Sequence, residues 1–329
     1  MSMANNDGSV QYYSSNASLQ SSVVVNKEVI LAAGTIRTPQ LLQVSGIGDP
    51  SLLASLNVTT VVDLPAVGQN LHDHVQCGMD GRADPSLTRS NLTTNATFAA
   101  ETRALYDTQH TGPYTASGGN FIGLLPLTTY SNIASTIQQE ASAQDASSYL
   151  AAGTPSEVIE GYRAVHEVLT DRLSAPDSAL VEFGWRDGGI GTSLQAPFSR
   201  GSIRAVSSST FDAPIVDPRS LHNPLDVVNF STISELHPVE TAPGANVTSD
   251  TDLARYVTQN ASPAWHLAGS CKMARREEGG VVDEQLKVYG VGNLRIVDAS
   301  VMPLLPAAHP MTTVYAVAEK AADIIRGRL

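Results

Sequence analysis

Two histidines stand in settings where side chains can do chemistry. His266 lies in a loop between Pro263 and Gly269, and His309 immediately precedes a predicted helix. Near neutral pH an imidazole can take a proton from an alcohol and later release it, whereas carboxylates and lysines do so only when strongly perturbed. Either histidine alone would favour an ordinary structural role. Together with the sequence motifs around them, they indicate a site for proton transfer.

The helix that follows His309 offers a second chemical device. The pattern predicts a helix from about Met311 to Arg326 that packs along one apolar stripe. The stripe residues are Val314, Val317, Ala318, Ala321 and Ile325. The first backbone N–H groups of the helix, around residues 311–313, have no partners within the helix, so they favour developing negative charge.

The first part of the chain indicates a strand, a glycine turn and a helix. Val23–Leu31 is typical of a buried strand because it is rich in β-branched residues. Thr38 and Pro39 open a short predicted helix over Gln40–Val44, with the proline at or near the first turn. Ser45–Gly48 predicts a tight turn. In this order, an α/β sheet presents a loop to a ligand.

Later segments are richer in strands. We expect strands at residues 10–13, 58–64, 179–185, 201–206, 286–289 and 294–297. Helices are expected at 99–106 and 157–173, while 132–152 is either helical or a mobile surface segment. Strands that alternate with helices give way to a strand-rich middle, and the α/β pattern then returns. This order predicts an α/β ligand-binding layer interrupted by a mixed domain.

The composition excludes several classes of protein. The chain has 329 residues, a formal net charge of -12 and a pI near 5.0, so we expect no nucleic-acid partner. No apolar run reaches the roughly 20 residues that a membrane span needs, so we expect no such span. Cys77 and Cys271 are too few for a disulfide scaffold and lack zinc-site spacing, and whether they pair stays open.

Asparagine sequons bear on the location of the protein. Seven asparagines lie in N-x-S/T sequons: Asn16, Asn57, Asn91, Asn95, Asn229, Asn246 and Asn260. They indicate either passage through a secretory pathway, with glycosylation, or chance in a chain rich in Ser and Thr. No signal peptide precedes the first predicted strand. The location is therefore open, with secretion as one interpretation.

Several motifs follow one another in a fixed order from about Val23 to Ile325. The first group is GTIRTPQLLQVSGIG at 34–48, VGQNLHDH at 67–74, PFSRGSIR at 197–204 and PIVDP at 214–218. The second group is WH at 265–266, GVVD at 280–283, LRIVDAS at 294–300 and AEKAAD at 318–323. The series resembles the glucose–methanol–choline (GMC) flavoprotein oxidoreductases, and its first motif is similar to the second signature of that family along its full length.

The resemblance implies a cofactor, a substrate and roles for particular residues. The cofactor is FAD and the substrate is a small alcohol. His266 takes the hydroxyl proton while the carbinol hydride passes to flavin N5, and His309 hydrogen-bonds the same oxygen. A histidine at this second position is more similar to the glucose oxidase and aryl-alcohol oxidase branches than to the choline branch. The residues implied to line the flavin are Asp298, Ala299, Pro310, Met311 and Thr312.

The resemblance also implies a fold of the class α/β plus α+β. An incomplete FAD-binding α/β layer is interleaved with a mixed substrate-binding domain built on an antiparallel sheet. The expected parts are an FAD-binding remnant at 1–75, the substrate-binding domain at 76–270 and a return to the FAD-binding domain at 271–329. The dinucleotide fingerprint G-x-G-x-x-G of the family is missing, because Ser51 takes the third glycine position after Gly46 and Gly48. We therefore expect a truncated chain that binds FAD weakly or not at all.

Two further functions stay open beside alcohol oxidation. A lyase or cyclase derived from the family would use the same histidines without net redox turnover, and a remnant of the family would be non-catalytic. Bleaching of the flavin by an alcohol separates oxidation from the lyase or cyclase, and flavin content separates both from the remnant. The sequence does not indicate the alcohol, the final electron acceptor or the oligomeric state.

Overall fold

The computed structural model describes residues 2–3, 9–13, 20–81, 91–115, 121–186, 189–231, 240–244 and 246–328. The α-helices are α1 (Gly34–Val44), α2 (Pro50–Ser55), α3 (Asn91–Thr94), α4 (Ala96–Gln109), α5 (Leu127–Tyr130), α6 (Ala134–Ala143), α7 (Ser156–Arg172), α8 (Pro224–Ser231), α9 (Asp250–Asn260) and α10 (Met311–Ile325). The 3₁₀ helices are η2 (Pro113–Thr115), η3 (Ala146–Tyr149), η5 (Arg276–Glu278) and η6 (Ala299–Val301). The strands are β1 (Ser2–Met3), β2 (Ser9–Tyr13), β3 (Gln20–Val24), β4 (Val29–Leu31), β5 (Ile47–Gly48), β6 (Val62–Asp63), β7 (Val75–Gly81), β8 (Phe121–Leu125), β9 (Val181–Arg186), β10 (Gly189–Leu194), β11 (Ser202–Arg204), β12 (Ile215–Asp217), β13 (Glu240–Ala242), β14 (Ser262–Pro263) and β15 (Leu294–Ile296).

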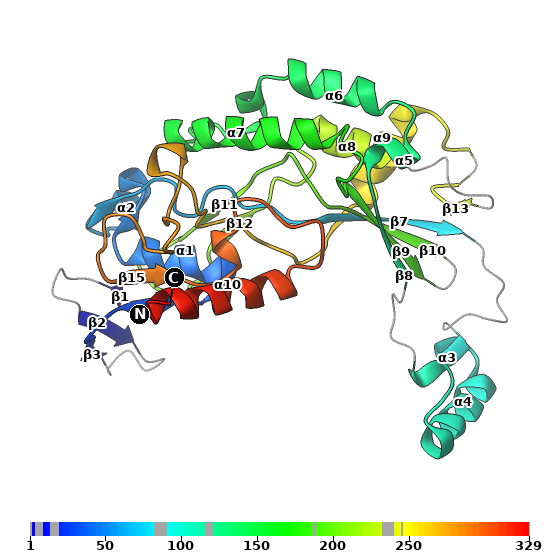
Figure 1. Cartoon of the computed structure of the whole chain (residues 1–329), viewed down its shortest axis with the longest axis horizontal. Coiled ribbons are helices and arrows are strands. Elements are labelled where there is room, and N and C mark those ends of the chain that lie inside the picture. The colour runs from blue at the N-terminus through cyan, green and yellow to red at the C-terminus, as the bar shows by residue number, and fades with distance from the viewer. Residues whose placement is uncertain are drawn as a thin grey trace.

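An antiparallel sheet occupies one end of the molecule (Figure 1). Its strand order is β13-β7-β10-β9-β8, and the short β14 pairs with β7 beside β13. Helices α5 to α9 pack against the sheet around a core that includes Phe183, Leu194 and Leu169. The alternation along β9, where Val181 and Phe183 are buried, gives the sheet this apolar face. The expected mixed domain on an antiparallel sheet is therefore confirmed.

A smaller α/β layer occupies the other end of the molecule. Here β4 pairs with β15 and β5 pairs with β6, and both pairs are parallel. Helix α1 packs beside them, and a second core joins Leu42 of α1 to Leu31 of β4 and Ile296 of β15. Leu31 and Ile296 come from opposite ends of the chain, so the layer closes only when the C-terminal part returns to it. The expected α/β component is thus present.

The expected buried strand Val23–Leu31 is wrong in part. β3 ends at Val24 and β4 begins at Val29, with a bend between them at Asn26 and Lys27. Within β4 only Leu31 is buried, while Ile30 is 47% exposed. The β-branched composition predicted the strand but could not show that polar residues interrupt it. Nor could it show that none of the described residues covers the face of β4 that carries Ile30.

Helix α1 begins earlier than its sequence pattern suggests. It runs from Gly34, so Pro39 lies inside the helix rather than in its first turn. A proline at this position donates no hydrogen bond to the carbonyl of Thr35. The hydroxyl of Ser270 donates to that carbonyl instead (2.6 Å), so a side chain from a distant loop replaces the missing helical bond. The expectation of a short helix opened by the proline is wrong for this tertiary reason.

Other expected elements survive in shortened or altered form. The strand expected at 58–64 is reduced to β6, and the strand expected at 201–206 is reduced to β11. The segment 286–289 is not a strand, and it makes isolated bridges at Lys287 and Val288. The segment 132–152 is helical, because it contains α6 and η3. Helices α4, α7 and α10 and strands β2, β9 and β15 lie where they were expected, within a few residues.

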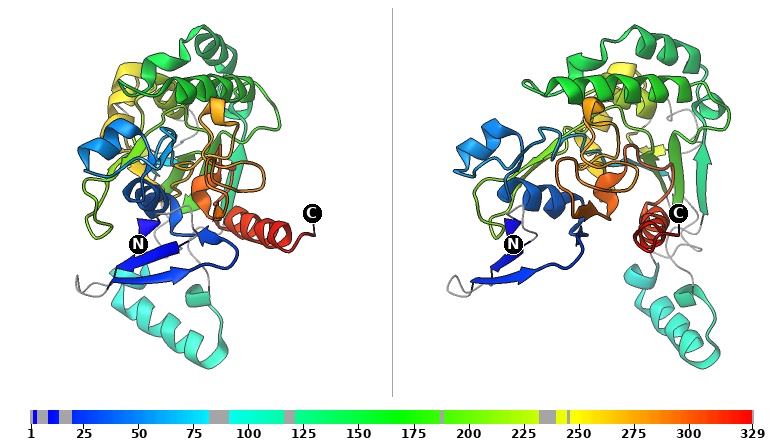
Figure 2. Two further views of the ribbon diagram at one scale, coloured as in Figure 1. Left: turned by 90° about the vertical axis from the view of Figure 1, so that its left-hand side faces the viewer. Right: turned by 60° about the vertical axis from the view of Figure 1, so that its left-hand side comes forward.

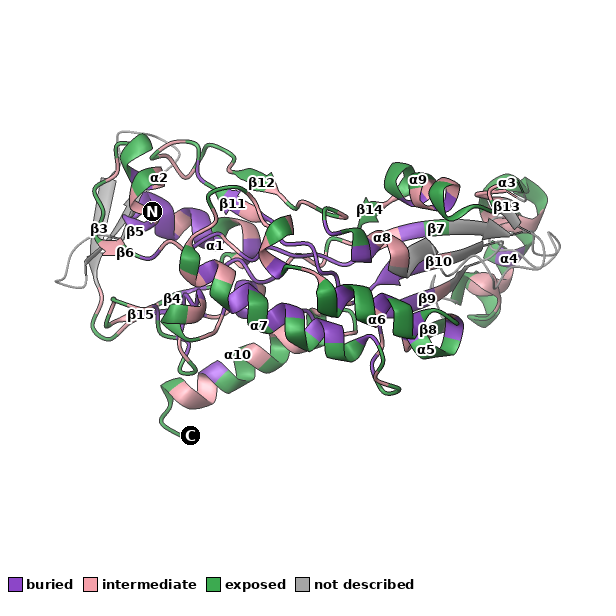
Figure 3. Ribbon diagram, turned by 90° about the horizontal axis from the view of Figure 1, so that it is seen from above, coloured by how far each residue is buried: buried purple, intermediate pink, exposed green. Residues whose placement is uncertain are grey.

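Helix α10 uses less of its apolar stripe than expected. Ala321 is its one buried residue among those described, while Val314 and Val317 pack against cores as partly buried residues. Ala318 is exposed and Ile325 is 40% exposed, so their assignment to the packed stripe is wrong. Figure 3 shows the contrast with α7, whose buried residues form a continuous stripe. The helical period predicted which residues of α10 share a face, but the elements packed against the helix decide how many of them are buried.

Three further observations complete the fold. Helices α3 and α4 stand away from the main body in both views of Figure 2. Cys77 and Cys271 are both buried and free, so they do not pair with each other. In the part of the chain that the structure describes, no helix combines the length and apolarity required to cross a bilayer.

Candidate active site

A bulge in the pairing next to β7 projects His266. The segment 262–268 runs antiparallel to 72–76, with Pro263 opposite Val75 and Ala268 opposite His72. Five residue steps separate Pro263 from Ala268, whereas three separate Val75 from His72. The extra residues cannot pair, so they form a loop that directs His266 away from the ladder. The local sequence shows a proline and a glycine, but the bulge itself depends on the partner strand.

The carboxylate of Asp73 fixes the backbone of this bulge. Its Oδ1 accepts a hydrogen bond from the backbone N–H of His266 (2.7 Å), and its Oδ2 accepts one from Trp265 (3.2 Å). Trp265 has a φ of 62°, a left-handed conformation that is uncommon for a bulky residue. Because the carboxylate holds both N–H groups, this backbone geometry is maintained and the His266 ring is kept in place.

His74 lies directly beside the His266 ring. The two Nδ1 atoms are 3.0 Å apart, and the rings meet edge to face with their centroids 5.1 Å apart. Burial, together with the positive charge that His266 and His309 can carry, lowers the pKa of His74 to about 3. His74 is therefore neutral at physiological pH and shares a single proton with His266 across this contact.

His309 lies on the other side of His266. Their ring centroids are 5.1 Å apart with an interplanar angle of 46°. The Nε2 atom of His309 is 3.2 Å from Oε1 of Glu182 on β9, a carboxylate that is 11% exposed. Burial lowers the pKa of His266, the charge of His309 lowers it further, and Glu182 opposes both effects. The two histidines predicted from the sequence are thus brought together beside β9 of the sheet.

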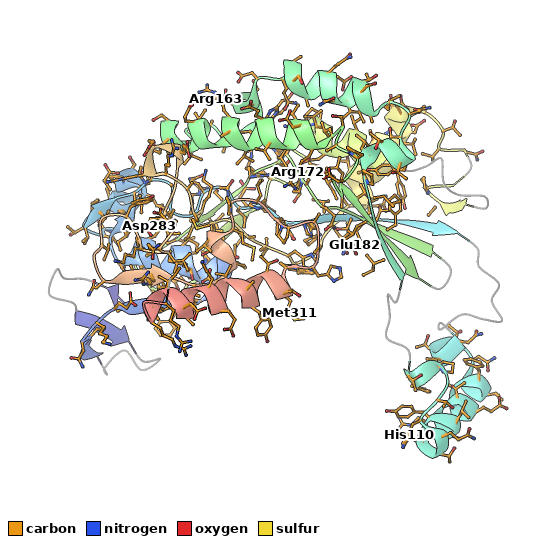
Figure 4. The ribbon with its side chains drawn as sticks, viewed as in Figure 1. His110, Arg163, Arg172, Glu182, Asp283 and Met311 are labelled. Carbon is orange, nitrogen blue, oxygen red and sulfur yellow. The ribbon has the colours of Figure 1, made fainter. Side chains whose placement is uncertain are left out.

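The start of α10 lies next to this pair (Figure 4). Met311 opens the helix and is 69% exposed, and Thr312 is also exposed. Pro310 occupies the N-cap position, and no side chain caps the helix. Val314 packs with Ala268 in a small apolar cluster, which ties the first turn of the helix to the bulge. The fifteen-residue helix therefore presents uncapped N–H groups beside the two histidines.

Asp298 and Ala299 lie beside the start of α1 and are placed differently from the exposed residues of α10. Asp298 is 7% exposed, and its oxygens accept hydrogen bonds from Thr38 Oγ1 (2.6 Å), Gly34 N (3.0 Å) and Ser300 N (2.8 Å). Its carboxylate thus clamps η6 onto the first turn of α1. Ala299 is partly buried in the same turn. A contact of Asp298 with a cofactor through its carboxylate would compete with these three bonds.

A flat aromatic cofactor with a polar edge fits the residues around the histidines. An exposed methionine and threonine at an uncapped helix N-terminus offer both apolar contact and N–H donors for a partial negative charge. Glu182 and His309 lie at the same place, so polar groups flank the apolar surface. In the part of the chain described by the structure, no cluster of His, Cys, Asp or Glu side chains could hold a metal ion.

Sequence reasoning missed three residues of this site. Asp73 and His74 lie in the polar motif at 67–74, which stood out by its hydrogen-bonding groups but was given no contact to His266. Glu182 gave no signal in the sequence, because it lies within a strand and its neighbours are apolar. The DH pair of the motif could have indicated a partner for His266, but its register against residues 262–268 is a tertiary property.

Comparisons with known proteins agree with this architecture. Two models of the GMC oxidoreductase family match the chain, one at residues 5–76 and the other at 197–318. The GMC oxidoreductase family protein Mala s 12 of Malassezia sympodialis is 35% identical over 97% of this chain and 52% of its own length. Patulin synthase of Aspergillus clavatus is 33% identical over 93% of this chain and 50% of its own length. The chain spans about half the length of these curated relatives.

Solved structures show the same likeness. An FAD-dependent oxidoreductase of Chaetomium thermophilum superposes with a TM-score of 0.92 at 32% identity, over 99% of this chain and 60% of that one. A fungal aryl-alcohol oxidase superposes with a TM-score of 0.83 at 36% identity, over 93% of this chain and 56% of that one. With both family models matched in order, the chain belongs to the GMC oxidoreductase family, whose cofactor is FAD.

Proposed function

We propose that this chain carries the catalytic histidines of an FAD-dependent oxidation of the CH–OH group of a small alcohol. The observation that carries the proposal is the pair His266 and His309, 5.1 Å apart beside the uncapped start of α10. When bound, FAD supplies the acceptor for the hydride. The residues of this chain bind the hydroxyl, remove its proton and hold the ring.

The proposed base is Nε2 of His266. His74 is neutral, and the backbone carbonyls of Gln195 and Pro306 lie near its ring, although its buried Nε2 makes no hydrogen bond to them. We assign the proton of His74 to Nε2, which leaves its Nδ1 as an acceptor. His266 then donates from its own Nδ1 across the 3.0 Å contact, and its Nε2 keeps a free lone pair.

His309 is proposed to hold the alcohol oxygen. With Nε2 of His309 donating to Glu182, its Nδ1 is the atom left to contact the substrate. The lowered pKa of His266 keeps that ring neutral near pH 7, so it can accept the hydroxyl proton. Met311 and Thr312 are proposed to contact the flavin, with their N–H groups toward its developing negative charge. Asp298, by contrast, is proposed to act through the turn that it clamps.

The substrate class follows from the family and from one exposed aromatic residue. The neighbouring solved structure is an aryl-alcohol oxidase, and Trp265 next to the proposed base is 79% exposed. An aromatic alcohol would stack on such a side chain. We therefore propose benzyl alcohol as the probe substrate for this site.

The test begins with titration of the purified chain with a large excess of FAD, because weak binding is expected, and flavin fluorescence measures the fraction bound. Benzyl alcohol is then added without oxygen, and bleaching of the flavin absorbance is followed. We expect bleaching in the native chain and a loss of about 10²- to 10⁴-fold in its rate for His266→Ala, with FAD still bound. The control is His110→Ala. His110 caps the C-terminus of α4 and lies far from Glu182 in Figure 4. Native-like bleaching in His266→Ala, or bound FAD without bleaching in the native chain, would refute the proposal.

The role of His74 has its own test. We expect His74→Leu to lower the rate of bleaching about 10-fold or more, because Nδ1 of His266 loses the acceptor that fixes its tautomer. His74→Asn retains an acceptor oxygen and should restore most of that rate. The pH profile separates positioning from loss of folding: the leucine variant should also shift the pH at which the rate falls. Equal rates in both variants would exclude this role.

A further inference from the structure

A cavity next to α7 is lined by three cationic side chains among its residues. Arg200, Arg219 and Lys272 face a cavity of about 380 Å³, including its open mouth. Val158 and Tyr162 of α7 form part of its wall, and α7 lies just below α6 in the upper part of Figure 1. This cavity is distinct from the site at the start of α10.

Arg200 is buried and has donors to spare. It is 5% exposed, and its guanidinium lies 5.8 Å from the centre of the Tyr162 ring. Its Nε donates to Asn70 Oδ1 (3.1 Å), and its Nη1 donates to the carbonyls of Pro197 (2.6 Å) and Ser199 (2.8 Å). These are neutral acceptors, so they orient the guanidinium without cancelling its charge. Nη2 has no hydrogen-bond partner among the described residues.

Lys272 is a second buried cation at the same cavity. It is 4% exposed, and Nζ donates one hydrogen bond to the carbonyl of Glu278 (2.7 Å). An ammonium group carries three donors, so two remain. Burial and the charge of Arg200 together lower the pKa of Lys272 to about 8, while the charge of Glu278 opposes them. The two cations therefore repel each other across the cavity.

Arg219 adds a third cation with an unsatisfied donor. Its Nη2 donates to the carbonyl of Tyr149 (3.3 Å). Its Nε is buried and has no hydrogen-bond partner. A buried N–H without an acceptor costs about 1–3 kcal/mol, so an acceptor at this place would stabilise the protein.

The described residues place no carboxylate in direct contact with these cations, although Asp226 interacts electrostatically with Arg200 and Glu278 with Lys272. None of the three forms an ion pair within 4.0 Å of an Asp or Glu oxygen in that part of the chain. Asp226 is buried nearby, but its oxygens accept from the backbone N–H groups of Phe198 (2.6 Å) and Ser199 (2.9 Å). Three cations beside two carboxylates that are not in contact with them leave buried positive charge only partly balanced, which is unfavourable.

We propose that this cavity binds a tetrahedral oxyanion, namely inorganic phosphate or sulfate. The planar donors of two arginines and the point charge of a lysine match several oxygens of one anion. Ser202 and Gln69, which also line the cavity, add neutral hydrogen-bonding groups. The anion would tie α7 to the loops of Asn70 and Lys272, so it would stabilise the folded chain independently of any flavin chemistry.

The test is a thermal denaturation series in phosphate, in sulfate, in acetate and in chloride, all at one ionic strength. We expect a saturable rise of about 3 °C in Tm with phosphate or sulfate and none with chloride. An equal rise in Tm with acetate would show that the cavity binds carboxylates as well as tetrahedral anions, and it would overturn the proposal. Absence of any saturable rise above the chloride control would also overturn it.

Two variants assign the effect to the cavity. Arg219→Gln changes a partly exposed residue and should abolish most of the phosphate-dependent rise while leaving the fold intact. Lys272→Met removes a buried charge and keeps the side-chain length, so its Tm without phosphate should equal or exceed that of the native chain. The matched control is Lys320→Met on the exposed side of α10, which should keep the full rise. A rise that persists in both cavity variants would place the anion elsewhere and refute the inference.

Discussion

Helices α7 and α10 are of similar length but are buried to very different extents. The residues that α7 buries are Val158, Gly161, Tyr162, Val165, His166, Leu169 and Thr170. Helix α10 buries Ala321, although its sequence is far less charged than that of α7. Figure 3 shows a buried stripe along α7 and a mostly exposed or intermediate surface along α10. Apolar composition alone therefore does not decide burial.

The difference is explained by what lies beneath each helix. α7 rests on the sheet, on α6 and on η5, so its stripe is covered along its whole length. α10 touches the second core through Val317 and Ala321 and the small apolar cluster through Val314, while Met311 and Tyr315 are exposed. The comparison indicates that α7 stabilises the fold, whereas α10 presents a surface. Substitutions on the two helices should separate these roles.

The largest contrast is expected from large-to-small substitutions. Leu169→Ala on α7 should lower the free energy of unfolding by about 4 kcal/mol, because it leaves a cavity in the core of the sheet domain. Tyr315→Ala on α10 should change it by less than about 0.5 kcal/mol, since that side chain is 67% exposed. Urea denaturation of both variants measures the difference. Similar losses would contradict the division of roles.

The second prediction concerns pH and three buried histidines, His74 and His72 beside the proposed site and His166 on α7. The folded-state pKa of His74 is about 3, below the 6.5 of an unfolded histidine, so the unfolded state takes up the proton first as the pH falls. The contribution of His74 to the free energy of unfolding is fully present above pH 6.5. It should decline by on the order of 3 kcal/mol as the pH falls to about 4. Burial also lowers the pKa of His72 and of His166, which adds to the same loss.

Unfolding at a series of pH values tests this prediction. His74→Asn should flatten the dependence of stability on pH by the contribution of one proton between pH 6.5 and 4. His110→Asn, which changes an exposed residue at the end of α4, should leave the dependence as it is in the native chain. An unchanged slope in His74→Asn would show that this ring is not the one that titrates on unfolding.

A smaller contrast comes from glycine and alanine on the two helices. A Cβ at Gly161 of α7 would lie 1.9 Å from the carbonyl oxygen of Glu278, so the backbone of η5 must shift. Gly161→Ala should therefore cost about 2 kcal/mol, despite the gain in helix propensity. The reverse change on α10, Ala318→Gly, should cost about 1 kcal/mol from propensity alone. Thermal denaturation compares them, and a stabilising Gly161→Ala would show that η5 yields freely.

The smallest effect is expected at the exposed start of α10. Met311→Ser should change the free energy of unfolding by less than about 0.5 kcal/mol, because the side chain is 69% exposed. On the proposed function, the same change should weaken binding of FAD, which flavin fluorescence measures. A large loss of stability with unchanged binding would reverse the roles assigned to this helix.

Many of the helices and strands could be predicted from sequence patterns, and the errors share one cause. The bounds of α7 were expected at 157–173 and lie at Ser156–Arg172, because the helical period and the polar face are both local. The start of α1 was expected near Pro39 and lies at Gly34, because the hydroxyl of Ser270 compensates for the missing backbone bond. Errors of this kind arise where a distant residue replaces a local rule.

The sequence by itself determined the family motifs, the helical stripe of α10 and the two histidines that could move a proton. Tertiary structure alone decided that His74 meets His266 across 192 positions and that Glu182 meets His309 across 127. Local patterns encode period and propensity, which extend over a few residues. A contact between distant side chains depends instead on strand register, on a bulge and on the closing of long loops, none of which has a local signature.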